Sequence, residues 1–356
     1  MKIVSSFILV ALHLMALTPA VLGQPMKIFG TRYDPVNNNL QIIQVTNPTL
    51  GSGNIETIAL DVATFTKANG KITGNAPNGT VISGTSLNAA AYDPTTFKFY
   101  FRDQQGSGPL YSWTVGATTI AYVSSAANMM PGNTTLLADN ATIYKGGLWY
   151  GEDNTDTLYR YDLALNTVRR FANVSGGIRS YDFGDIAVSS AGLLYINGNL
   201  THGGHNGLDK IDISAVTATS GTVNSSNFTA IADYGSGSTG ATQQIFFDNT
   251  GANLFAVQSI NGQFNAQTWH QINTTTGVET GDIWTSTFNY SDLASGFLSV
   301  PEPSTIFLLL GTPALMGSAW YFRNRKKLEK KAAELAAAGN KTEGAEQEEN
   351  TVIAGV

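Results

Sequence analysis

A pair of strand-like segments recurs five times between residues 33 and 277, and this repeat constrains the fold more than any other feature. In each unit, a turn rich in Asp, Asn, Pro or Gly adjoins an aromatic or aliphatic strand, and a second strand ends near Asp or Asn. The units start 43 to 59 residues apart. The paired segments are "YDPVNNNLQIIQV" with "GNIETIALDVAT", "YDPTTFKFYF" with "GPLYSWTV", "IYKGGLWYGED" with "DTLYRYDLALNT", "IAVSSAGLLYINGN" with "NGLDKIDIS", and "IFFDNTGANLFAVQ" with "WHQINTTTG".

A period of roughly 40–50 residues with several short strands per unit is typical of β-propeller blades. The sequence therefore predicts an all-β propeller of about five blades. Apolar runs at 148–150, 193–195 and 254–256 predict inner strands that are buried on both faces. Residues 158–161 and 208–211 alternate in polarity, which predicts half-exposed strands.

Two alternatives remain open for this body. The long stretches 61–84 and 217–240 leave room for a sixth or seventh blade, and the unequal spacing also suits a β-sandwich. The body loosely resembles propellers whose blades read LY-x-ID-x-x-TG. Leu158-Tyr159 with Tyr161-Asp162 carries this resemblance, as do residues 272–277.

The composition excludes several classes of function. The chain has 356 residues, a formal net charge of −6 and no cysteine. An acidic body has no basic surface to neutralise phosphates, which argues against nucleic acid as a partner. Without cysteine there is no disulfide, no thiol nucleophile and no thiolate metal site.

The N-terminus has the features of a signal peptide. Lys2 precedes an apolar run over 3–17, and small or medium residues lead to a predicted cleavage after Gly23. The alternative is an uncleaved N-terminal anchor. We therefore expect an exported protein, with the signal peptide at 1–23 and an all-β domain at 24–299.

A second apolar stretch lies near the C-terminus. Residues 303–322 carry no charge and are long enough to cross a bilayer as a helix, with Trp320 and Tyr321 at one end. A basic stop follows at once, which predicts that this end is cytoplasmic and that the body lies outside. The alternative is a buried core helix. The basic stop consists of Arg323, Arg325, Lys326 and Lys327.

The order of motif, apolar helix and basic stop resembles the PEP-CTERM sorting signal. The motif residues are Val300, Pro301, Glu302, Pro303, Ser304 and Thr305, and the whole signal covers 300–327. The resemblance implies export, membrane anchoring, and processing near Pro-Glu-Pro by an exosortase-type protease. It also implies a bacterial envelope and an association with exopolysaccharide or biofilm, with release to the cell surface or matrix after processing.

One feature departs from this signal. Such signals usually end soon after the basic residues, whereas this chain continues through 328–356. We expect a charged cytoplasmic tail there, with a short helix at 328–338 and a disordered segment after it. If the tail prevents processing, the protein remains anchored by a single membrane span.

Two clusters in the body suggest metal binding. His202 and His205 lie on a Gly-containing loop close to Asp209, as zinc or copper would require. Asp153 and Asp156 offer carboxylate oxygens on a turn, which suits calcium. The alternatives are a polar hairpin loop and an ordinary turn rich in Asp and Asn. We therefore expect no cofactor, with calcium as the alternative.

No arrangement of catalytic residues emerges from the sequence, and we predict no catalytic residue. The first hypothesis is an exported surface or matrix protein with a non-catalytic binding propeller, whose partner is an extracellular polysaccharide or an envelope protein. The others are a structural envelope component and a secreted hydrolase or lactonase-like propeller enzyme. A ring of Asp, Glu, Asn and His at the axis would favour the enzyme, and an aliphatic lining would count against it.

Overall fold

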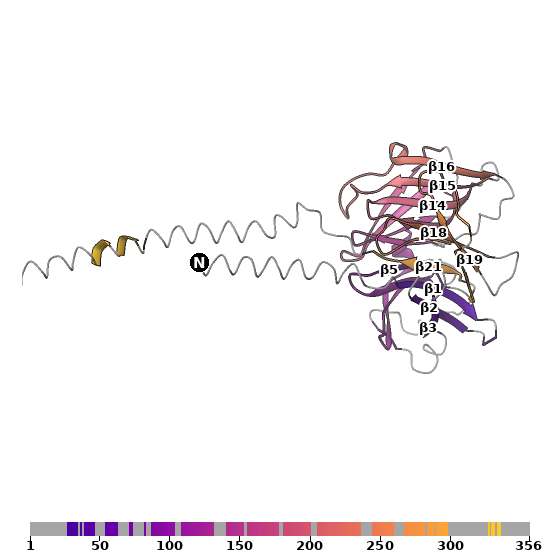
Figure 1. The fold of residues 1–356 in the computed structure, drawn as a ribbon, viewed down its shortest axis with the longest axis horizontal. Coiled ribbons are helices and arrows are strands. Elements are labelled where there is room, and N and C mark those ends of the chain that lie inside the picture. Colours follow the sequence, from indigo (N-terminus) through magenta and orange to yellow (C-terminus); the bar gives the residue numbers. More distant parts are fainter. Residues whose placement is uncertain are drawn as a thin grey trace, which may run out of the picture. The chain divides into compact units, whose positions relative to one another are not determined.

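The computed structural model contains five β-sheets arranged around a common axis (Figure 1). The chain divides into two units, Met1–Leu298 and Ser299–Val356, and the sheets belong to the first. The residues that the structure describes are 27–34, 36–37, 39–46, 54–62, 71–73, 82, 87–103, 108–131, 140–152, 155–177, 181–200, 205–235, 244–259, 267–281, 283–288, 290–297, 327, 329–331 and 333–335.

Each sheet forms one blade, in which the strands follow one another from the axis outward. Blade 1 is β21 (Asp292–Ser295), β1 (Lys27–Asp34), β2 (Asn39–Thr46) and β3 (Ile55–Asp61). Blade 2 is β5 (Leu87–Asp93), β6 (Lys98–Asp103), β7 (Leu110–Thr114), β8 (Thr119–Ser124) and β4 (Lys71–Thr73). Blade 3 is β9 (Thr142–Tyr144), β10 (Gly147–Glu152), β11 (Thr157–Asp162) and β12 (Thr167–Ala172). Blade 4 is β13 (Tyr181–Val188), β14 (Leu193–Leu200), β15 (His205–Asp212) and β16 (Phe228–Gly235), and blade 5 is β17 (Gln244–Phe247), β18 (Leu254–Ser259), β19 (Gln267–Ile272) and β20 (Trp284–Ser286).

The ring is closed by strands from the two ends of the body. The innermost strands β21, β5, β9, β13 and β17 contact one another in turn, and β17 also contacts β21. In blade 1, β21 pairs antiparallel with β1, and Ile28 lies opposite Ser295. Residues near the start and the end of the body thus share one blade, which makes the ring continuous.

The predicted propeller is confirmed with five blades, and the β-sandwich alternative is wrong. The two long stretches form no further blade within the described residues. Within 61–84 the described strand is β4, which pairs parallel with β8 at the outer edge of blade 2. Within 217–240 lie the 3-10 helix η2 (Ser225–Asn227) and β16, the outer strand of blade 4. The short helix α3 (Ala126–Met129) lies between blades 2 and 3 in the sequence.

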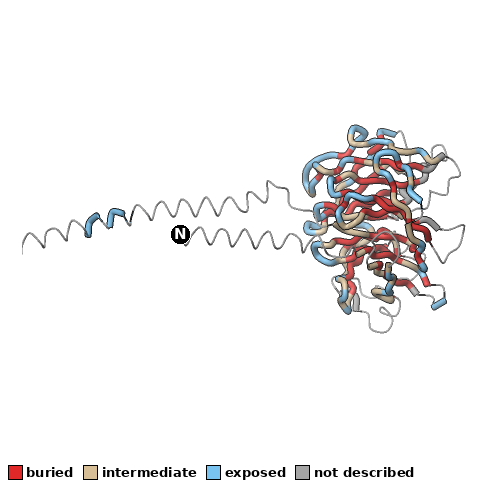
Figure 2. The backbone as a smooth tube through the Cα atoms, in the orientation of Figure 1, coloured by how far each residue is buried: buried red, intermediate tan, exposed pale blue. Residues whose placement is uncertain are grey.

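The predicted burial of individual strands holds for the inner strands and needs one correction. The runs 148–150, 193–195 and 254–256 lie in β10, β14 and β18, the second strands from the axis, and their residues are buried apart from the half-buried Leu193. All six residues of β11 are buried, although their alternation predicted a half-exposed strand. The reason is that blades on both sides pack against β11: Tyr159 and Tyr161 share a core cluster with Tyr100 of blade 2, and Leu158 shares one with Leu194 of blade 4. Figure 2 shows that buried segments run through the middle of the body.

Arg160 shows how such a strand accommodates a charge. Its side chain is buried, and its guanidinium donates to the Asp162 carboxylate at 3.0 Å and to the Lys145 carbonyl at 3.2 Å. A buried cation is tolerated only with such partners. In β11, the polarity of a residue therefore does not predict whether its side chain is exposed.

The repeated Asp turns shape the hairpins. In the turn after β11, the Asp162 carboxylate accepts hydrogen bonds from the backbone N–H groups of Ala164 and Leu165, and Asn166 takes a positive φ of 53°. Although burial alone would raise the pKa of Asp162, these N–H groups and Arg160 hold it below its ordinary value. Asn273 makes the equivalent contacts after β19, and there Gly277 takes the positive φ.

The antiparallel order of the strands separates two faces of the propeller. The face that we call the hairpin face carries the turns between first and second strands and between third and fourth strands. Its described turns include 94–97, 145–146, 163–166, 189–192, 249–253, and 273–281 with 283. The opposite face, which we call the loop face, carries the turns between second and third strands and the connections from blade to blade.

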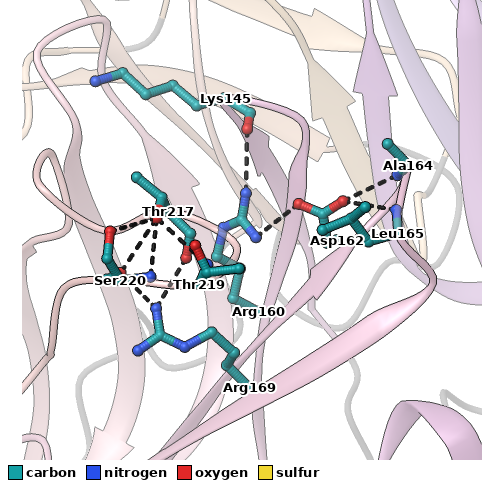
Figure 3. A network of polar contacts seen from close by, with 9 residues as sticks. All are labelled: Lys145, Arg160, Asp162, Ala164, Leu165, Arg169, Thr217, Thr219 and Ser220. Carbon is teal, nitrogen blue, oxygen red and sulfur yellow. Dashed lines mark hydrogen bonds and ion pairs between the residues drawn. The ribbon is translucent and has the colours of Figure 1, made fainter.

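Blades 3 and 4 are joined on the hairpin face by a basic side chain (Figure 3). Arg169 of β12 donates to the carbonyl oxygens of Thr217, Ser220 and Gly221 at 2.8, 2.5 and 2.6 Å. Lys145 also donates to the Ser214 carbonyl, at 3.1 Å. These contacts fix the loop after β15 against the outer strand of the preceding blade.

Candidate functional site

The predicted sorting signal lies outside the described residues up to residue 326. Of the basic stop, Lys327 is described, and it is exposed and helical, as are the described residues of 329–335. Among the described residues, no helix has the length and apolar character that a membrane span needs. The predicted span at 303–322 and the predicted signal peptide therefore stay predictions.

The two predicted metal clusters fall partly outside the described residues. His202 and Asp153 are not described, and His205 begins β15. Asp209 lies in the same strand and is buried. In the described part of the chain, no three His, Asp or Glu side chains come close enough together to hold a metal ion. Both metal sites therefore stay predictions.

Asp156 has a structural role in the part of its loop that is described. Its carboxylate accepts from the backbone N–H of Ser175 at 2.9 and 3.0 Å and from the Ser175 hydroxyl at 2.7 Å. Ser175 is fully buried within the turn that follows β12. This carboxylate thereby connects the loop after β10 to the connection between blades 3 and 4.

A small cavity lies at the axis of the propeller. It offers about 10 Å³ to the centre of a water molecule, which is room for about one water. Its lining is mainly aliphatic and aromatic, with Thr142 and Ser295 as its hydroxyl-bearing residues. A cavity of this size and character has no space for an organic substrate. The lining residues are Ala91, Ala141, Thr142, Ile143, Ile186, Ala187, Val188, Ile245, Phe246, Phe247, Leu293, Ala294, Ser295 and Phe297.

Two carboxylates beside this lining connect neighbouring blades. Asp185 of β13 accepts from its neighbour Ile186 N–H at 2.7 Å and from Ile245 N–H of blade 5 at 2.6 Å. Asp292 of β21 accepts from Leu293 N–H at 2.7 Å and from Ala90 N–H of blade 2 at 2.6 Å. Both side chains are almost fully buried.

The environment of Asp185 acts on its charge in two opposing ways. Burial raises its pKa well above the ordinary value, and the two backbone N–H groups partly oppose this effect. Because both oxygens already accept hydrogen bonds, this carboxylate serves to join blades. The described axis thus combines a largely aliphatic lining with two carboxylates that accept hydrogen bonds from backbone N–H groups.

Neither Asp185 nor Asp292 was predicted as an axial residue from the sequence. A signal was nevertheless present, because "GDIAVSS" at 184–190 is similar to "SDLASGF" at 291–297. The second segment lies beyond the fifth repeat unit and forms β21, the strand that closes the ring. Recognising it as a fifth copy of the innermost strand, after β5, β9, β13 and β17, would have predicted the closure.

One family model matches the chain. Residues 299–326 match the PEP-CTERM protein-sorting motif, which confirms the resemblance of the C-terminal segment. The motif implies an exported protein with a membrane-anchored C-terminal tail that is processed by an exosortase, itself a membrane protein. No curated protein has a detectably similar sequence.

Several solved structures are similar to this chain at a low level. A calcium-binding regucalcin from Agrobacterium tumefaciens is 11% identical, with a TM-score of 0.33 over 57% of this chain and 58% of its own. A nidogen/laminin complex gives 7% identity and a TM-score of 0.42 over 78% of this chain and 100% of the matched chain. A luciferin-regenerating enzyme gives 13% identity and a TM-score of 0.37 over 76% of this chain and 78% of its own. None of these values bears on function.

Proposed function

We propose that this protein is an exported envelope protein whose propeller binds an extracellular polysaccharide through its loop face, without catalysing a reaction. The C-terminal sorting signal would hold the hairpin face toward the membrane until an exosortase processes the chain. After processing, the propeller would be released to the cell surface or the matrix.

One observation carries this proposal, namely where the chain leaves the propeller. Ile28 and Ser295 lie opposite each other in blade 1, at the ends of β1 and β21 that belong to the hairpin face. Gly296 lies beside Pro94 in a hairpin of blade 2, and Phe297 lies beside Gly251 in a hairpin of blade 5. The chain toward the sorting signal therefore leaves near the axis of the hairpin face, which leaves the loop face free for a partner.

The composition of the chain segments that connect second with third strands, or one blade with the next, suits a neutral sugar polymer. Amide and hydroxyl side chains dominate them, and these groups both donate to and accept from sugar hydroxyls without requiring charge. The connecting segments include "TKANGKITGNAPNGTVISGTS" at 66–86, "LTHGGHNG" at 200–207, "GSGSTGATQ" at 235–243 and "INGQFNAQ" at 260–267.

Binding of the full chain to exopolysaccharide isolated from the host would test this function. We expect retention on immobilised polysaccharide that weakens several-fold in the variant Gln263→Ala with Phe264→Ala, which changes the chain segment between β18 and β19. The matched control, Thr275→Ala with Thr276→Ala, changes a turn of the hairpin face and should bind normally. Equal binding by both variants, or no retention of the unchanged protein, would contradict the proposal.

A further measurement addresses processing of the sorting signal. The intact mass of the mature protein from cells should correspond to an end near Pro301 if the sorting signal is processed. A mass that includes Val356 would instead show a stably anchored protein.

Retention on polysaccharide should be the same with and without a chelator, and a loss with the chelator would support the alternative of a calcium site.

A further inference from the structure

The hairpin face carries exposed apolar side chains at the tips of three hairpins. Phe97 is 56% exposed between β5 and β6, Leu165 is 56% exposed between β11 and β12, and Val278 is 64% exposed between β19 and β20. These hairpins belong to blades 2, 3 and 5, so the three side chains are distributed around the axis. Single exposed apolar residues are common, but a set on one face around the exit of the chain requires a further explanation.

Phe97 provides a second, independent observation. It takes a positive φ of 54°, in the left-handed region that a bulky residue rarely adopts. At the corresponding positions of two other hairpins, the chain has Asn166 and Gly277, which tolerate this backbone. Phe97 thus combines backbone strain with apolar exposure, and such an outlier supports a hypothesis of function.

The length of the chain beyond the propeller identifies what could cover these tips. Phe297 is the last described residue of the body, and the predicted membrane span begins at Pro303, six residues later. Six residues of fully extended chain reach at most about 20 Å. With the span in the bilayer, the centre of the hairpin face therefore cannot lie farther than this from the lipid hydrocarbon.

In two of these hairpins, the carboxylate of the turn accepts hydrogen bonds within the protein, and the apolar side chain at the tip is the exposed group. In the hairpin of Phe97, the Asp93 carboxylate accepts from the Thr95 N–H and from the hydroxyls of Thr95 and Thr96. In the hairpin of Leu165, the Asp162 carboxylate accepts from backbone N–H groups and from Arg160. The turn carboxylates thus have partners within the protein, whereas the apolar tips are exposed.

We propose that Phe97, Leu165 and Val278 enter the headgroup region of the bilayer while the chain is anchored, so that the hairpin face lies against the membrane. This inference rests on the membrane anchoring in the proposed function and adds the surface that contacts the lipid. After processing near Pro301, nothing would hold the face at the bilayer, and three small tips would release readily. The contact would then orient the propeller before processing and be lost afterwards.

Site-directed spin labelling of the full chain tests this directly, because the natural sequence has no cysteine to remove. Single variants Phe97→Cys, Leu165→Cys and Val278→Cys would be labelled and reconstituted in vesicles of phosphatidylethanolamine and phosphatidylglycerol. Val36→Cys is the matched control, because Val36 is an 87% exposed apolar residue between β1 and β2, in a turn of the loop face. Accessibility of each label to oxygen and to a water-soluble nickel chelate reports its depth.

We expect labels at 97, 165 and 278 to lose nickel accessibility several-fold relative to the label at 36, and to regain it when the chain is cut near Pro301. If the protein floats with the vesicles but all four labels remain equally accessible to nickel, lipid contact by the hairpin face is overturned while the anchor stands. If the protein does not float with the vesicles, the anchor fails and this inference fails with it.

Discussion

Several residues of this propeller have a backbone conformation or a degree of burial that their residue type disfavours. Phe97 adopts a backbone conformation that favours Gly or Asn, and Arg160 and Asp185 are charged residues in a buried setting. In the last two cases, the compensation is visible as hydrogen bonds to named partners. For Phe97, no compensation is visible within the described part of the chain, which is why its role is sought outside the protein.

Replacing Phe97 by Asn should stabilise the propeller. Asn tolerates the left-handed backbone at lower cost, and the exposed ring contributes little burial, so we expect a gain of about 1 kcal/mol in the free energy of unfolding. Denaturant unfolding would measure it, with Leu165→Asn as a control at a position outside the positive-φ set. A loss of stability would show that the ring of Phe97 has packing that its exposure does not reveal.

Asp185→Asn should destabilise the protein while preserving shape. The amide can accept one of the two backbone hydrogen bonds, but its NH₂ group would then face the N–H of Ile186 or Ile245. An unsatisfied buried donor costs about 1–3 kcal/mol. Asp292→Asn should behave alike, because its geometry is equivalent. Unchanged unfolding free energies in both variants would contradict the blade-joining role of these carboxylates.

At the scale of secondary-structure elements, contacts between blades matter as much as pairing within them. The loop after β15 has little regular structure, and Arg169 of β12 holds three of its carbonyl oxygens (Figure 3). Backbone carbonyls that a loop cannot satisfy by itself need partners of this kind. The neighbouring blade therefore holds this loop together with the loop's own hydrogen bonds between Thr217 and Ser220.

Arg169→Met should loosen this loop without unfolding the ring. It removes three charge-assisted hydrogen bonds at a half-exposed site, which we expect to cost about 1–2 kcal/mol. Amide hydrogen exchange over 213–223 should accelerate. Arg170→Met is the matched control, because Arg170 is exposed and donates to the Tyr159 hydroxyl at a longer distance of 3.3 Å. Equal rates of amide hydrogen exchange in the two variants would show that Arg169 does not hold this loop in place.

At the scale of the whole molecule, closure of the ring depends on β21. Its pairing with β1 supplies the innermost strand of blade 1, and Leu293 and Ala294 are buried there. Processing near Pro301 would cut the chain after this strand. The sorting signal could thus be removed without opening the propeller.

Two truncations should differ sharply in stability. A chain that ends at Ser299 retains β21 and should unfold like the full protein. A chain that ends at Tyr290 lacks β21 and leaves the inner edge of β1 unpaired, so we expect a loss of several kcal/mol, comparable with the whole stability of a typical domain. Thermal unfolding followed by circular dichroism would measure the difference. Similar melting of the two chains would show that closure contributes little.

The sequence by itself predicted an all-β propeller of about five blades and the sorting signal, and it left a sixth or seventh blade and a β-sandwich open. Turn chemistry at residues such as Asp162 and Asn273 is local, and a repeated strand pair can bury its faces only against other copies of itself. The order of Pro-Glu-Pro motif, apolar stretch and basic stop is likewise visible without a structure.

Only the tertiary structure decided which strand lies at the axis and which polar residues are buried. The first three strands of the body, β1, β2 and β3, form the outer three strands of their blade, because β21 comes from the other end of the body and takes the place beside the axis. The burial of Arg160 and Asp185 likewise follows from neighbouring blades that are distant in sequence. Periodicity reports the alternation of side chains within a strand, whereas burial depends on what other segments place against both faces.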